Sequence, residues 1–187
     1  TGNDSVSYAA NGPTAPWRTI GRAAWGSTSR GTPNAAEAAR AGDVVRIAAG
    51  TYVTTATNAR FDPAYNPVNS GTASSPIRFE TAGTVVLTFS SGSGPMIGSN
   101  SRNHIHWSSF TISETSAPTR SDTGPVTFFN VTGGLIEAST LTGNPNWTAR
   151  VGDNYPGVRL EDAIDVRIAH NVIRNYGGQT GDENHNG

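Results

Sequence analysis

The sequence predicts an all-β protein that winds as a parallel β-helix, or β-solenoid, in which coils of short strands stack on one another. Residues 157–175 alternate apolar and polar positions in three short bursts, separated by Asp, Asn and Gly residues that are typical of tight turns. The same pattern recurs earlier in the chain. The 187 residues are also rich in Gly (22) and Pro (11), with many Thr, Ser and Asn, a composition typical of β-solenoids.

Three apolar positions recur with the same internal spacing in three successive coils. They are Ile97, Trp107 and Ile112 in the first coil, Val126, Ile136 and Leu141 in the second, and Val158, Ile168 and Ile173 in the third. The second set follows the first by 29 residues, and the third follows the second by 32. A single coil cannot bury its own inward row, so this recurrence predicts that the coils stack.

The elements before these coils follow from local signals. Residues 1–42 are predicted to be a polar lead-in and an N-terminal cap, with helical segments at 17–24 and 34–40. Residues 43–187 are predicted to form the coils of the same domain, beginning with looser copies around Val45, Phe79 and Leu87. Residues 54–75 interrupt them as an insertion, interpreted either as a wall of a binding groove or as a plain decoration.

Several segments carry a resemblance to a known group of proteins. Residues 43–52 and the preceding residues 8–23 resemble the opening of proteins in the pectate-lyase-like superfamily, and residues 75–79, 101–107 and 166–173 are similar to the same group. That group includes chondroitinase-B-like and family-nine pectate-lyase-like enzymes. The resemblance implies a right-handed single-stranded parallel β-helix, an extracellular location, and the binding or degradation of polysaccharide. It equally covers non-catalytic phage tailspikes, virion fibres and cell-surface proteins.

Composition excludes several other classes. The formal net charge of −1 argues against a general nucleic-acid binder, which needs a basic face to neutralise phosphates. The absence of Cys excludes a disulfide framework and a cysteine metal site. No apolar run approaches the roughly 20 residues that a membrane span requires.

Five residues are candidates for binding a glycan: His106, Arg159, Glu161, Arg167 and Arg174. Strand alternation predicts that His106 and Arg167 point outward in one stacked row, and that Arg159 points outward above Thr127. Arginine suits an acidic polysaccharide because its fork of N–H groups matches a carboxylate. The alternative interpretation is that these charges pair with each other on a solvated surface.

The sequence leaves the reaction type open. All 13 basic residues are Arg, so the Lys base that the resemblance implies for a lyase has no counterpart. A hydrolase would need two carboxylates that face one groove, for which Glu161, Asp162 and Asp165 supply the residue types. The catalytic residues are therefore not assigned.

Three further expectations concern the second half of the chain. Asp182 and Glu183 belong to an oxygen-rich cluster that offers ligands for Ca²⁺, although it lacks the spacing of a recognised calcium loop. Asn171 lies where stacked asparagine ladders occur in β-helices, but Ser139 and Phe110 hold this position in earlier coils, so the ladder is expected to be absent or only beginning. The last coil has no predicted cap, so we expect the solenoid to continue beyond residue 187, to self-associate, or to be covered by another chain.

Overall fold

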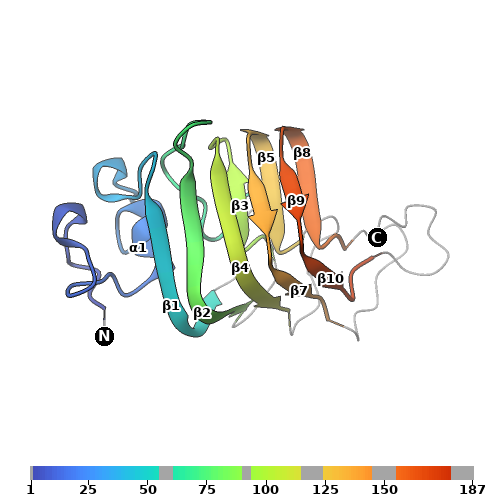
Figure 1. Ribbon diagram of the computed structural model, residues 1–187, viewed down its shortest axis with the longest axis horizontal. Coiled ribbons are helices and arrows are strands. Elements are labelled where there is room, and N and C mark those ends of the chain that lie inside the picture. The colour runs from blue at the N-terminus through green and yellow to red at the C-terminus, as the bar shows by residue number, and fades with distance from the viewer. Residues whose placement is uncertain (1, 55–60, 90–93, 115–123, 145–154, 178–187) are drawn as a thin grey trace.

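The chain folds as a β-solenoid of about three turns, with very little helix (Figure 1). The computed structural model describes residues 2–54, 61–89, 94–114, 124–144 and 155–177. Within these residues the strands form two sheets, one with seven strands and one with three. In each sheet, every pair of neighbouring strands is parallel. The predicted architecture is therefore confirmed.

The N-terminal lead-in and cap contain two single turns of 3₁₀-helix, η1 (Tyr8–Ala10) and η2 (Ala35–Glu37), and one short helix, α1 (Ile20–Trp25). The Thr19 hydroxyl caps α1 by accepting from the Arg22 N–H, and Gly26 ends it in the left-handed conformation. The second predicted helix is reduced to η2, because the Ala39 N–H donates to the Ala23 carbonyl of α1 instead of continuing a helical ladder.

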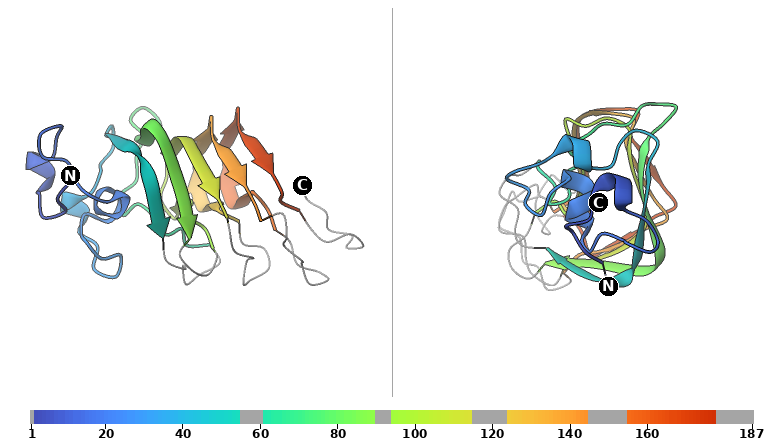
Figure 2. Two further views of the ribbon diagram at one scale, coloured as in Figure 1. Left: turned by 90° about the horizontal axis from the view of Figure 1, so that it is seen from below. Right: turned by 90° about the vertical axis from the view of Figure 1, so that its left-hand side faces the viewer.

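The larger sheet has the order β1-β2-β4-β6-β9, with β7 beside β4 and β10 beside β7. Its strands are β1 (Val44–Thr54), β2 (Ile77–Phe89), β4 (Ile105–Ser113), β6 (Leu135–Glu137), β7 (Thr140–Thr142), β9 (Arg167–Ala169) and β10 (Val172–Arg174). The smaller sheet has the order β3-β5-β8, with β3 (Ile97–Asn100), β5 (Val126–Thr132) and β8 (Val158–Ile164). The end-on view of Figure 2 shows the coils superimposed along one axis.

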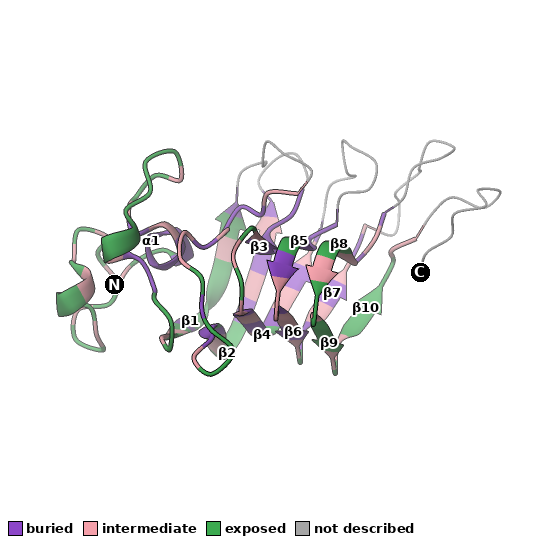
Figure 3. Ribbon diagram, turned by 90° about the horizontal axis from the view of Figure 1, so that it is seen from above, coloured by how far each residue is buried: buried purple, intermediate pink, exposed green. Residues whose placement is uncertain are grey.

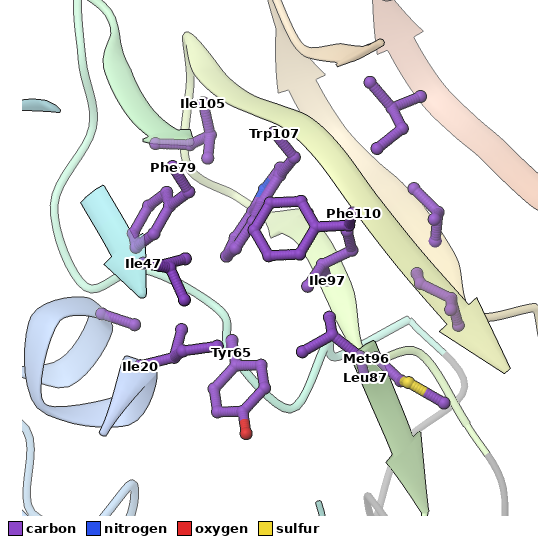
Figure 4. Close-up of a cluster of buried hydrophobic side chains, with 14 of the residues drawn as sticks. Ile20, Ile47, Tyr65, Phe79, Leu87, Met96, Ile97, Ile105, Trp107 and Phe110 are labelled. Atoms are coloured by element: carbon purple, nitrogen blue, oxygen red, sulfur yellow. The ribbon is translucent and has the colours of Figure 1, made fainter. Parts of the chain in front are cut away.

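The strand register confirms the predicted apolar rows. Val45 pairs with Phe79, Phe79 with Trp107, Trp107 with Ile136, and Ile136 with Ile168. Phe79 and Trp107 are fully buried and their rings stack with centroids 4.1 Å apart (Figure 4). Such columns supply the interior contacts that a single coil cannot make.

The bends of the chain repeat as closely as the strands do, both between strands and within them. Residues with a left-handed backbone conformation recur at three places in each coil: Ser101, Asn130 and Asp162 at the first, His104, Gly133 and Asp165 at the second, and Ser109, Ala138 and His170 at the third. Asn, Asp and His adopt this conformation more readily than β-branched residues do, which explains why they recur at these places in the sequence.

Hydrogen bonds connect successive coils at the residues that follow the third of these positions. The side-chain Oδ1 of Asn171 accepts from the Ser139 N–H (2.9 Å), and the Ser139 hydroxyl accepts from the Phe110 N–H (3.1 Å). The Asn171 side-chain amide also donates to the Ile136 carbonyl (2.9 Å). The ladder therefore begins one coil earlier than the sequence indicated, because a serine hydroxyl can replace the asparagine.

The third coil leaves part of its apolar row exposed, as Figure 3 shows for β10. Leu160 is 44% exposed, and Ile168 and Ile173 are each 43% exposed. Their register partners in the preceding coil, Phe128, Ile136 and Leu141, are fully buried.

Candidate functional site

The outer face of the β3-β5-β8 sheet brings together two of the five predicted residues. Strand alternation turns Ile97, Val126 and Phe128 into the core, so the residues between them face outward. One outward row is Gly98, Thr127 and Arg159, and the next is Asn100, Phe129 and Glu161. The predicted position of Arg159 above Thr127 is confirmed.

An aromatic pair covers part of this face. Phe61, from the insertion, stacks on Phe129 of β5 with ring centroids 4.5 Å apart and planes 11° apart. The guanidinium carbon of Arg159 lies 5.0 Å from the centroid of the Phe61 ring. All three side chains are half-buried, so the cluster presents flat apolar and cationic surface to solvent.

The insertion is fastened to the first strand of this sheet. The N–H groups of Ala64 and Tyr65 donate to the carbonyls of Pro95 and Met96, both at 2.9 Å. The Asn66 side chain accepts from the Asn100 N–H (2.9 Å) and donates to its carbonyl (3.3 Å). Asn66 thereby satisfies the outer edge of β3, and this fixed position allows Phe61 to contribute to the face.

Arg159 and Glu161 form an ion pair beside the aromatic rings. The Nε and Nη2 atoms of Arg159 donate to Glu161 Oε2 at 3.2 and 2.5 Å. The Arg159 side chain is 18% exposed and that of Glu161 36%. The pair is partly desolvated, so it can exchange hydrogen bonds with a ligand more strongly than a fully exposed pair could.

Thr127 adds a buried polar group to the same face. Its side chain is fully buried, and its hydroxyl has no hydrogen-bond partner in the described part of the chain. Gly98 beside it is also buried, so this outward row is covered at these two residues, and the accessible part of the face lies at Arg159 and at the row of Asn100, Phe129 and Glu161.

The other predicted residues lie elsewhere. His106 and Arg167 face outward on the larger sheet, where the register aligns them in one row with Arg78 and Leu135, as predicted. Burial and the neighbouring Arg78 lower the pKa of His106, which favours the neutral ring. Arg174 is exposed on β10 and donates from Nε to the Thr142 hydroxyl (3.1 Å). The five residues therefore do not form one site.

The metal prediction at Asp182 and Glu183 lies outside the described residues. Among the residues that the structure does describe, no group of three or more His, Asp or Glu side chains could hold a metal ion.

A second cluster, not predicted from the sequence, surrounds Glu114. The Tyr155 hydroxyl donates to Glu114 Oε2 at 2.7 Å, and the rings of Tyr155 and Tyr176 lie 4.9 Å apart. Burial raises the pKa of Glu114 to about 7, although the two tyrosine hydroxyls oppose the shift. The sequence does contain a signal for this cluster. Phe110 and Ile112 are alternate residues that point into the core, and Glu114 is the next residue in that alternation.

The aromatic pair was also missed, although half of it was visible in the sequence. Phe128 and Phe129 are adjacent on a strand, so one of the two rings must face outward. Phe61 could not be assigned to this face, because no periodic pattern links the insertion to β5.

Comparisons with known proteins do not add a family to this description. Neither the protein-family models, nor the curated proteins, nor the solved structures contain a significant match to the chain. In the described part of the chain, no helix has both the length and the apolar character needed to cross a membrane.

Proposed function

We propose that this protein binds an extracellular polysaccharide along the outer face of the β3-β5-β8 sheet. The observation that carries the proposal is the stacked pair of Phe61 and Phe129 beside the Arg159–Glu161 ion pair. Ligand sites combine apolar and aromatic surface with a few polar groups that fix orientation. The apolar C–H face of a sugar ring can pack on the phenyl rings while its hydroxyls exchange hydrogen bonds with the ion pair.

An acidic polysaccharide suits this face best. The planar fork of Arg159 already binds one carboxylate, that of Glu161, and a sugar carboxylate of the same shape would exchange with it on this fork. The resemblance of the chain to pectate-lyase-like proteins supports the same ligand class. Binding is better supported than cleavage, because the carboxylate beside the rings, Glu161, is already engaged by Arg159.

Binding is tested by isothermal titration with oligouronates and with neutral oligosaccharides of matched length. We expect Phe129→Ala and Arg159→Lys to weaken oligouronate binding about tenfold, because the first removes the stacking surface and the second removes the fork. Arg167→Ala on the larger sheet is the matched control and should bind as the wild type does. Weakened binding in Arg167→Ala alone would place the ligand on the other sheet, and no binding of any glycan would refute the proposal.

A non-catalytic structural role is a second candidate, favoured by the exposed apolar residues of the third coil, such as Ile164 and Val172. Analysis of products separates it from degradation. A lyase leaves an unsaturated uronate at the new chain end, a hydrolase leaves a saturated one, and a purely structural protein leaves the polysaccharide intact.

A further inference from the structure

A cavity of about 890 Å³ separates the N-terminal lead-in from the first strand of the larger sheet. Residues 44–48 of β1 and Tyr52 line one side, and Tyr8, Trp17 and neighbouring residues of the lead-in line the other. Its floor is apolar, because Ile20, Ala23, Ala39 and Ile47 line it and are buried. Figure 1 shows the lead-in and α1 on the side of β1 that faces away from β2.

The edge of β1 that faces this cavity carries unpaired main-chain groups. The Arg78 N–H donates to the Asp43 carbonyl (2.9 Å), and this bond shows which alternate residues of β1 bond to β2. In a parallel pair, alternate residues bond to the same neighbour. Residues 43, 45 and 47 therefore bond to β2, and Val44 and Arg46 direct their N–H and C=O groups to the opposite edge.

The lead-in and cap leave that edge open. Among the described residues, none of their main-chain or side-chain groups bonds to the main chain of Val44 or Arg46. The next residue of the same parity, Ala48, has its carbonyl bonded by the hydroxyl of Tyr52 (3.0 Å). An open strand edge beside a cavity is the arrangement that accepts an added strand.

The charges around the cavity indicate which strand would fit. Arg18 and Arg46 line it and are exposed, and neither makes an ion pair within the described part of the chain. The acidic residue of the lining, Asp43, is engaged by the Tyr8 hydroxyl and by the Arg40 N–H. With two arginines and one carboxylate, the lining carries a net positive charge.

We propose that this cavity binds an extended peptide, which adds to β1 as an edge strand and carries apolar and acidic residues in alternation. In such a strand, one set of side chains lies over Ile20 and Ile47 on the apolar floor. The other set lies on the outward side, in line with Arg46. The cavity lining contains none of Phe61, Phe129, Arg159 and Glu161, so the site is independent of the proposed polysaccharide function.

The test uses fluorescein-labelled heptapeptides of alternating Asp and Val and measures fluorescence anisotropy on the full chain. Two peptides are compared, one N-methylated at its odd-numbered positions and one at its even-numbered positions. One of the two should bind about tenfold more weakly or worse than the unmethylated peptide, and the other should differ from it by less than about twofold. This difference arises because only one parity donates to the β1 edge. Equal effects of the two parities, or no saturable binding, would overturn the proposal.

Two variants of the protein complete the experiment. Val44→Pro removes a donor from the open edge without removing a bond to β2, and should weaken binding about tenfold. Arg18→Ser/Arg46→Ser leaves the backbone unchanged and should weaken binding of the Asp–Val peptide but not of a Ser–Val peptide. Arg78→Ser, outside the cavity lining, is the control. Loss of binding in the control, or unchanged binding in both variants, would contradict strand addition at this site.

Discussion

Glu114 is a carboxyl group buried in the interior of the solenoid. It occupies an inward position at the end of β4, is only 5% exposed, and accepts a hydrogen bond from Tyr155. Burial disfavours its ionised form, and the pKa rises from 4.5 to about 7. The folded protein therefore holds a proton at Glu114 over a pH range in which the unfolded chain does not.

This proton couples stability to pH. The stabilisation is complete below the unfolded pKa of 4.5 and is lost as the pH rises through about 7. We expect Glu114→Gln to remove this dependence, making the variant more stable than the wild type at pH 8 by about 3 kcal/mol at most, at about 1.4 kcal/mol per pKa unit. Urea unfolding at pH 5 and pH 8 measures it. Glu137→Gln is the control, and an identical pH slope in Glu114→Gln and wild type would contradict the assignment.

Asn171 provides a second prediction at the level of one residue. Its side chain accepts from the N–H of Ser139, which lies between β6 and β7, and donates to the carbonyl of Ile136 in β6. We expect Asn171→Ala to lower the free energy of unfolding by about 1–3 kcal/mol, since two groups lose their partners. Asn171→Ser should lose less, because Ser139 fills the equivalent role one coil earlier. Equal losses in the two variants would show that the hydrogen bonds are not the cause.

At the level of the strand, β3 depends on close backbone approach to β5. Gly98 has a φ of 122°, and a Cβ at this position would lie 1.9 Å from the Thr127 carbonyl oxygen. We expect Gly98→Ala to destabilise the fold by about 4 kcal/mol or more, because the main chain of β3 or β5 would have to move to make room for the methyl group. Gly12→Ala, where a Cβ would meet nothing within 4 Å, should change thermal stability little. Similar melting temperatures for the two variants would refute this account.

The same strands show how far sequence reasoning reaches. The column of Phe79, Trp107 and Ile136 was predictable, because stacking requires apolar residues at a fixed period. The outward positions of Arg159 and Arg167 followed from the same alternation, but their placement on two different sheets did not. The Phe61–Phe129 contact depends on an insertion whose path is set by hydrogen bonds to Pro95, Met96 and Asn100, and such contacts leave no periodic signal.

At the level of the whole molecule, the two ends of the solenoid differ. The α1 cap buries Ile20 and Ala24 against the first coils. In the third coil, the inward-facing Ile168 and Ile173 are each 43% exposed, and Ile164, which faces outward, is 62% exposed. Contiguous exposed apolar side chains on strand edges promote association. The 187-residue polypeptide is therefore expected to self-associate through the third coil.

Sedimentation velocity over a concentration series measures this association. We expect Ile164→Thr/Ile173→Thr to raise the dissociation constant about tenfold, because the substitutions remove apolar area while keeping β-branched side chains. Val53→Thr in β1, near the capped end, is the control. It removes exposed apolar surface away from the third coil, since Val53 is 55% exposed, and should leave the dissociation constant unchanged. A wild-type polypeptide that stays monomeric across the series would contradict the prediction.

The equal spacing of the apolar rows has a consequence for how the chain can change in length. Ile97 to Trp107, Val126 to Ile136 and Val158 to Ile168 each span ten residues, and each coil then reaches its third apolar position five residues later. The difference between the 29- and 32-residue repeats lies wholly between Leu141 and Val158. A change in the length of this segment leaves the ten- and five-residue spacings within each coil unchanged, so it is the natural place to graft foreign sequence.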